Sequence, residues 1–181
     1  MRAPQIKYIV IHCTAGFKSA LAVEDYFLRP KTKGGRGWHT GGYHRIVERG
    51  GQIAELYDFN RVTNGVGGFN SQCIHISYVG GINYEKSKSG IYIAEDTRTD
   101  LQKVGIHKCI SEAVYWLRDN GKDIKKDLMV LGHRDFSTDR NHDNVIQSNE
   151  RIKECPSFDA IPEYNIIYGA TNSIQTLPHN R

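Results

Sequence analysis

Two histidines and a cysteine, His12, His133 and Cys155, are the residues whose types and surroundings best suit a catalytic metal site. His12 and His133 each end an apolar, strand-like run, and Cys155 stands directly before a proline. Two imidazoles and one thiolate fill three corners of a tetrahedron around Zn²⁺ and leave the fourth for water or a substrate carbonyl, as catalytic zinc requires. If folding brings the three together, we expect a hydrolase. Their spacing alone is weak evidence, because it matches no compact CxxC or HExxH pattern.

The segments that carry the two histidines predict buried strands. Residues 6–11 are nearly continuous in apolar and aromatic side chains, and residues 128–131 form a short apolar run before Gly132. Such runs are typical of central strands that are covered on both faces. Ligands of open α/β sheets bind beyond the carboxyl ends of the strands, so His12 and His133 are expected to line one crevice. A single histidine at a strand end is more often structural, so the metal hypothesis depends on all three ligands together.

Other segments complete an α/β pattern. Residues 19–28 have helical spacing, and residues 99–120 begin with a capping box at Thr99 and Gln102 and continue with apolar residues at helical intervals. Residues 43–48 and 52–56 flank Arg49-Gly50-Gly51 and predict a β-hairpin, and residues 74–79 predict another strand. The Gly-rich segment 31–42 is irregular, and either a substrate-side loop or a flexible connector would suit it.

Length and composition indicate one domain. The chain has 181 residues, 39% of them hydrophobic, which suits a single core. The formal net charge of +4 and the pI near 8.8 are compatible with an anionic polymer such as cell-wall glycan. The charges are scattered, without the dense basic run that favours nucleic acid, so we expect a solvated surface and no nucleic-acid partner.

The chain begins without a charged leader, apolar core or cleavage site, so we expect synthesis in the cytoplasm without a signal peptide. No stretch approaches the roughly 20 apolar residues that cross a bilayer, which predicts no membrane partner. Four cysteines in such a chain do not suggest a disulfide framework. Cys109 lies in a helical pattern and is expected to be a buried small hydrophobe, whereas Cys13 and Cys73 flank strands without an evident partner.

A polar segment between residues 139 and 150 resembles a calcium loop. It places oxygen side chains at positions one, three, five and twelve of an EF-hand pattern, but Asn144 stands where the pattern asks for glycine, and the preceding helix is missing. The alternative is a plain polar loop that caps a short helix carrying Lys153. The candidate calcium ligands are Asp139, Asn141, Asp143 and Glu150.

Five motifs in order resemble those of the N-acetylmuramoyl-L-alanine amidase type 2 family, which includes zinc-dependent phage lysozymes of the amidase type and the peptidoglycan recognition proteins. The resemblance runs from about Ile6 to Asp159. Each motif is short, but their order and spacing are specific. They are Ile9-Val10-Ile11-His12, Gly42-Tyr43-His44, Val79-Gly80-Gly81, Gly132-His133-Arg134-Asp135 and Lys153-Glu154-Cys155-Pro156-Ser157-Phe158-Asp159.

The resemblance implies a fold and a reaction. The fold is a single central mixed β-sheet flanked by helices, with residues 1–161 as the zinc amidase domain and residues 162–181 as a partly flexible tail. His12, His133 and Cys155 match the zinc ligands, Tyr43 the active-site tyrosine and Lys153 the catalytic lysine. The implied reaction is hydrolysis of the amide between N-acetylmuramic acid and the L-alanine of peptidoglycan. The implied protein is a monomer that acts on the cell wall after release or export, as an endolysin or an antibacterial effector.

One position departs from the family. Many relatives carry a histidine in the loop before a Gly-aromatic-Asn segment, and Gly65 occupies that position here. A substrate contact made there by the family's histidine is therefore in doubt. His44 and His75 lie nearby in strand-like segments, and we expect both to be structural histidines with satisfied hydrogen bonds.

Two alternatives remain open. A recognition protein would bind muropeptides without cutting them, although noncatalytic relatives commonly lack the cysteine ligand that Cys155 matches. A Cys-His thiol hydrolase with Cys155 as its nucleophile would stay active without metal and lose activity on alkylation.

Overall fold

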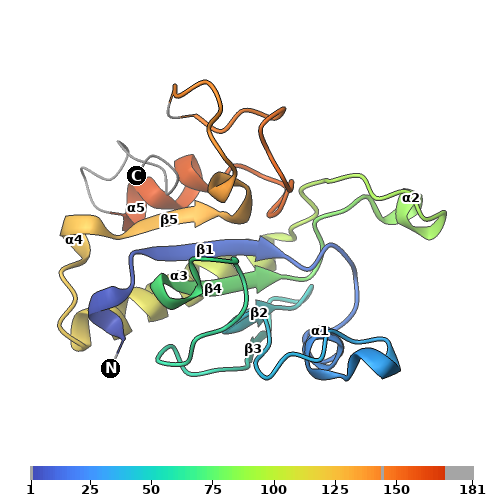
Figure 1. The fold of residues 1–181 in the computed structure, drawn as a ribbon, viewed down its shortest axis with the longest axis horizontal. Helices are drawn as coiled ribbons and strands as arrows, with labels where there is room; N and C mark the ends of the chain where they lie inside the picture. Colours follow the sequence, from blue (N-terminus) through green and yellow to red (C-terminus); the bar gives the residue numbers. More distant parts are fainter. Residues whose placement is uncertain (1, 144, 170–181) are drawn as a thin grey trace.

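A computed structural model describes residues 2–143 and 145–169 of the chain. Its centre is a five-stranded sheet in the order β3-β2-β4-β1-β5 (Figure 1). β1 pairs in parallel with β4 and β5, β2 pairs in parallel with β4, and β3 is antiparallel to β2. The predicted mixed sheet is therefore confirmed. The strands are β1 (Tyr8–Cys13), β2 (Arg45–Val47), β3 (Ile53–Glu55), β4 (Cys73–Tyr78) and β5 (Met129–Gly132).

Helices flank the sheet, and the two predicted over residues 19–28 and 99–120 are present. α1 begins after Ser19, whose side chain caps it, and α3 begins with the predicted capping box of Thr99 and Gln102. The short helices α2, α4 and α5 were not predicted. The α-helices are α1 (Ala20–Leu28), α2 (Tyr84–Lys88), α3 (Asp100–Asp119), α4 (Ile124–Asp127) and α5 (Ile166–Tyr168), preceded by a π-helix (Ile161–Asn165). The 3-10 helices are Ala3–Gln5, Lys31–Lys33, Asn70–Gln72 and His133–Phe136.

The two faces of the sheet have different coverings. In β1, Ile9 and Ile11 belong to the core that α3 covers, whereas Tyr8 and Val10 belong to a second apolar cluster with Phe136. Side chains alternate along a strand, so His12 follows Tyr8 and Val10 onto the face opposite α3. The same alternation puts His75 of β4 on that face, because its neighbours Ile74 and Ile76 lie in the α3 core.

α3 covers one face of the sheet, where it packs on β4 and β2. Its apolar stripe is buried and meets the buried side chains of β4. Cys109 lies in this stripe, so its prediction as a buried small hydrophobe is confirmed. The buried stripe consists of Ile106, Cys109, Ile110, Ala113, Val114 and Leu117.

The predicted C-terminal tail starts inside the π-helix, and its described part packs on the sheet. Tyr164 is fully buried, and the side chain of Asn165 accepts a 2.8 Å hydrogen bond from the backbone N–H of Val130 in β5. Arg98 binds the Glu163 carboxylate with two hydrogen bonds of 2.8 and 2.9 Å. Residues 170–181 of this tail lie outside the described residues.

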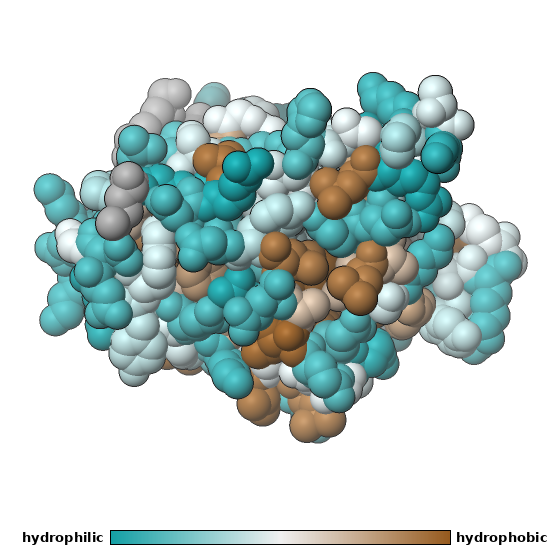
Figure 2. Space-filling model, turned by 90° about the horizontal axis from the view of Figure 1, so that it is seen from below, coloured by the Kyte–Doolittle hydropathy of each residue, from teal (hydrophilic) through white to brown (hydrophobic). Residues whose placement is uncertain are grey.

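No helix in the described part of the chain is long and apolar enough to cross a membrane. Figure 2 shows the lower face of the molecule, where apolar residues gather near the middle and hydrophilic residues lie around them. The helix α1 lies toward this face in Figure 1, and its Leu21 and Leu28 are exposed.

Candidate metal centre

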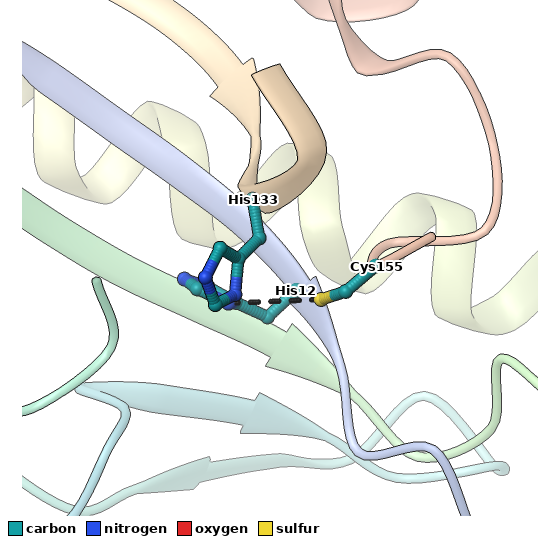
Figure 3. Close-up of side chains that lie close together, drawn as sticks. All are labelled: His12, His133 and Cys155. Atoms are coloured by element: carbon teal, nitrogen blue, oxygen red, sulfur yellow. Dashed lines mark hydrogen bonds between the residues drawn. The ribbon is translucent and has the colours of Figure 1, made fainter. Parts of the chain in front are cut away.

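His12, His133 and Cys155 converge at one end of the sheet (Figure 3), although they are far apart in the chain. One ligand atom from each lies within 4.8 Å of the other two. The Nδ1 atom of His12 is 3.7 Å from the Cys155 sulfur, and the rings of His12 and His133 are 4.8 Å apart. His12 comes from β1, His133 follows β5, and Cys155 lies on a loop. His12 is fully buried, and the other two are half-buried.

Main-chain contacts hold Cys155 against both histidine segments. The backbone N–H of Arg134 donates a 2.7 Å hydrogen bond to the carbonyl of Cys155, and the N–H of Cys13 donates a 3.3 Å hydrogen bond to its sulfur. Gly132 leaves space for Pro156, because a Cβ atom there would lie 2.6 Å from the proline Cδ. The backbone at Gly132, next to His133, therefore packs directly against Pro156, next to Cys155.

The protonation states of the three side chains suit a metal. Burial lowers the pKa of His133 to about 4 and that of His12 well below its usual value, so both imidazoles are neutral near pH 7 with a free lone pair. Burial also raises the pKa of the Cys155 thiol. A bound zinc ion displaces such a proton and is held by the thiolate. Two neutral nitrogens and one sulfur, all within 4.8 Å of one another, are therefore a donor set that fits zinc.

The candidate centre lies in a cleft of about 1050 Å³. Tyr43, Lys153, His133 and Cys155 line it together. The Gly-rich segment 31–42 also contributes to its wall, through Arg36 and Trp38, which favours the substrate-side loop over the connector. Apart from one 3-10 turn at Lys31–Lys33, that segment is irregular, as predicted.

The two predicted catalytic side chains reach the centre from different sides. The Tyr43 ring is 5.1 Å from the His12 ring, and burial raises the pKa of its hydroxyl, so Tyr43 stays a proton donor at neutral pH. The positive charge of Lys153 acts on His12, His133 and Cys155. The prediction that a short helix carries Lys153 is wrong, because Lys153 is exposed on an irregular segment. The backbone on either side of Lys153 is held by two hydrogen bonds, from the Ile152 N–H to the Ser137 hydroxyl and from the Arg134 N–H to the Cys155 carbonyl.

The segment 139–150 satisfies its own acidic side chains. Glu150 accepts hydrogen bonds of 2.8 and 2.9 Å from the backbone N–H groups of Arg140 and Gln147, and Asp139 accepts one of 2.7 Å from His142. The described acidic residues of this loop do not form a group of converging metal ligands. These contacts favour the plain polar loop over the calcium site. The side-chain amide of Asn141 donates a 3.0 Å hydrogen bond to the Asp143 carboxylate.

The two additional histidines differ in their surroundings. The Nε2–H of His44 donates a 2.9 Å hydrogen bond to the Arg61 carbonyl, and its Nδ1 accepts one of 2.9 Å from the N–H of His75, as expected for a structural histidine. The same expectation for His75 is wrong. Its Nδ1 lies 3.1 Å from Nε2 of His12, and its own buried Nε2 has no partner in the described part of the chain. The alternation of β4 could have placed His75 on the same face of the sheet as His12, but it does not show that the two strands are neighbours.

Comparisons with known proteins show the family of the chain. A family model described as N-acetylmuramoyl-L-alanine amidase matches residues 2–156. An uncharacterized protein of Haemophilus influenzae is 33% identical over 94 residues, which are 52% of this chain and 69% of that protein.

Two solved structures share the fold. A variant of Drosophila PGRP-LB in complex with tracheal cytotoxin has a TM-score of 0.59 at 16% identity, covering 92% of this chain and 83% of that one. The Ph2119 endolysin of a Thermus scotoductus bacteriophage has a TM-score of 0.55 at 19% identity, covering 91% and 85%. At these identities the likeness concerns the fold alone.

Proposed function

Because the chain belongs to the N-acetylmuramoyl-L-alanine amidase family, we propose that it is a zinc-dependent hydrolase that cleaves the amide between N-acetylmuramic acid and L-alanine in peptidoglycan. The observation that carries this proposal is the convergence of His12, His133 and Cys155 within 4.8 Å of one another, beside the cleft that Tyr43 and Lys153 line. The three would hold zinc through two nitrogens and one sulfur, leaving a fourth position toward the cleft.

Zinc at such a centre supplies Lewis-acid chemistry and makes water a better nucleophile near neutral pH. The side chains of the cleft act on the rest of the reaction. When a nucleophile adds to the scissile amide, negative charge develops on the carbonyl oxygen, and the Lys153 ammonium and the Tyr43 hydroxyl stabilise it. Either group can also pass a proton to the leaving amine of L-alanine.

A thiol hydrolase is the less suitable alternative. A nucleophilic cysteine needs a lowered pKa, and burial raises that of Cys155. The Nδ1 atom of His12 lies 3.7 Å from the Cys155 sulfur, which is close enough for His12 to act as the base. Chelation and alkylation therefore decide between the thiol hydrolase and the zinc enzyme.

A recognition protein is the main rival from another class. The solved structure of Drosophila PGRP-LB holds tracheal cytotoxin in the same fold, which supports a muropeptide as the partner of this chain in either case. The complete ligand set His12, His133 and Cys155 favours the enzyme. We further propose that the protein is a monomer, acting on the cell wall after release or export, without nucleic-acid or membrane partners.

The test is incubation of purified sacculi with wild type, with Cys155→Ser, with chelator-treated wild type, and with Cys109→Ala as a buried cysteine control. We expect freed stem peptides with wild type and Cys109→Ala only. Sacculus binding without release would favour the recognition protein. Activity that survives chelation but not alkylation would favour the thiol hydrolase. Release of reducing sugars would overturn the amidase assignment.

A further inference from the structure

His75 lies in the middle of β4, fully buried and beside the candidate metal centre. β1 and β4 are parallel, with Val10 opposite His75 and His12 opposite Ser77, so His75 and His12 are diagonal neighbours on one face of the sheet. The rings are 5.1 Å apart in an edge-on arrangement, and His12 Nε2 is 3.1 Å from His75 Nδ1.

The two nitrogens of His12 face different groups. Nδ1 is directed toward the Cys155 sulfur, at 3.7 Å, and Nε2 toward His75. A neutral imidazole that offers its Nδ1 lone pair to a metal carries its proton on Nε2. The Nε2–H then donates to Nδ1 of His75, which accepts with its lone pair. Histidine ligands of metals commonly donate their second N–H in this way, and the acceptor fixes both tautomer and ring direction.

Two contacts hold the His75 ring in place. On one side the His44 ring stacks at 6.0 Å with an interplanar angle of 25°, and His44 is itself fixed by its bonds to Arg61 and to the His75 backbone. On the other side is Gly65, where a Cβ atom would lie 2.4 Å from both Cγ and Nδ1 of His75. A side chain at residue 65 and an imidazole at residue 75 therefore exclude each other.

This exclusion accounts for the departure at Gly65. Where many relatives have a histidine in the loop, this chain has none, and the imidazole that fills the space comes from the strand. Buried polar atoms are normally paired, but Nε2 of His75 has no partner among the described residues. This cost indicates that the other ring nitrogen, Nδ1, has a role, and its contact is His12.

We propose that His75 is a positioning residue of the zinc centre, which accepts a hydrogen bond from His12 Nε2 and holds Nδ1 of His12 toward the metal, and that Gly65 is the residue that makes room for it. The inference rests on the zinc site of the proposed function. It predicts zinc affinity and a histidine tautomer, which do not depend on the substrate.

The first measurement is the zinc dissociation constant, by competition with a chromophoric chelator. We expect His75→Ala to weaken zinc binding by about 10–100-fold, as for other partners of metal-ligating histidines. His75→Asn, whose side-chain oxygen takes the place of Nδ1, should remain within a few-fold of wild type. The matched control is Cys73→Ala, which empties a buried position on the same face of the same strand and should leave zinc affinity unchanged.

A double-mutant cycle tests the role of Gly65. Gly65→Ala should weaken zinc binding in the wild-type background and have little further effect in His75→Ala, because the ring with which it collides is gone. Equal effects in both backgrounds would contradict the proposed exclusion.

The second measurement is long-range ¹H–¹⁵N NMR of the histidine side chains in zinc-loaded wild type, which needs no variant to fold. The expected result is a proton on Nε2 of His12 and zinc on Nδ1. A proton on Nδ1, or tight zinc binding by His75→Ala, would overturn the proposal. If His75→Ala loses zinc affinity while wild type releases no stem peptides from sacculi, the positioning role stands and the amidase function falls.

Discussion

The backbone N–H of Arg134 donates a 2.7 Å hydrogen bond to the carbonyl of Cys155, and it thereby joins the segments that carry two of the three candidate zinc ligands. Arg134 follows His133 directly, so this bond fixes the distance between the end of β5 and the loop that brings in Cys155. The Cys13 N–H bond to the Cys155 sulfur joins the third segment in the same way. Hydrogen bonds of the protein itself thus hold the three ligand-bearing segments together.

Zinc removal should destabilise the fold because the metal would join three distant segments. A ligand that binds only the folded state raises its stability. We expect chelation to lower the melting temperature of wild type and of Cys109→Ala, measured by calorimetry, but not that of Cys155→Ser. Elemental analysis should find about one zinc per chain in the first two proteins only. An unchanged melting temperature on chelation of a zinc-loaded protein would contradict this role.

Tyr43 and Lys153 should affect turnover without affecting zinc content. Tyr43→Phe and Lys153→Met each remove one donor to the developing oxyanion, and such losses reduce kcat by about 10²–10³. Lys125→Met, a change in α4 at an exposed lysine, is the matched control and should be as active as wild type. The measurement is the initial rate of stem-peptide release with zinc determined on the same samples. Loss of zinc in either catalytic variant would assign that residue to the structure of the centre instead.

Arg98 should stabilise the docking of the C-terminal segment. Its side chain is 4% exposed and binds both Asp96 and Glu163. Arg98→Met would leave the Asp96 and Glu163 carboxylates without this partner. We expect a loss of about 3 kcal/mol, the low end for buried pairs, because both carboxylates are partly exposed. The free energy of unfolding in urea measures this. The exposed pair of Arg29 and Asp25 provides the control, Arg29→Met, which should have no measurable effect.

His44 should make the protein sensitive to acid. Burial lowers its pKa from 6.5 to about 3, so below pH 6.5 the unfolded chain binds a proton that the folded chain excludes. Linkage then requires that stability falls as the pH decreases through this range. His44→Gln keeps a donor and an acceptor but does not titrate, and its free energy of unfolding should fall less steeply between pH 6.5 and about 3. Parallel pH profiles for the two proteins would rule out His44 as the cause.

The loop 139–150 should not bind calcium tightly. Its acidic side chains already accept backbone hydrogen bonds, as shown for Glu150 with Arg140 and Gln147. Calorimetric titration of EDTA-stripped, zinc-reloaded protein with calcium should give no binding heat. A clear heat that disappears in Glu150→Gln would instead support the calcium hypothesis.

The sequence determined those parts of this protein that depend on neighbours along the chain. The apolar runs before His12 and His133 predicted two central strands, and the capping box at Thr99 predicted the start of α3, because burial and capping leave local periodicities. The types of the three candidate ligands and their positions at segment ends predicted their convergence, since carboxyl ends of parallel strands share one edge.

The tertiary structure decided what depends on pairing between segments. Only the register of β1 and β4 placed His75 beside His12, and only the path of the loop at Gly65 left room for that ring. Distant partners likewise hold the chain beside Lys153, where the Ile152 N–H binds Ser137, and the docked Tyr164, whose hydroxyl binds Arg98. A strand pattern states which face a side chain occupies but not which strand lies next to it, because register is chosen by packing of the whole sheet.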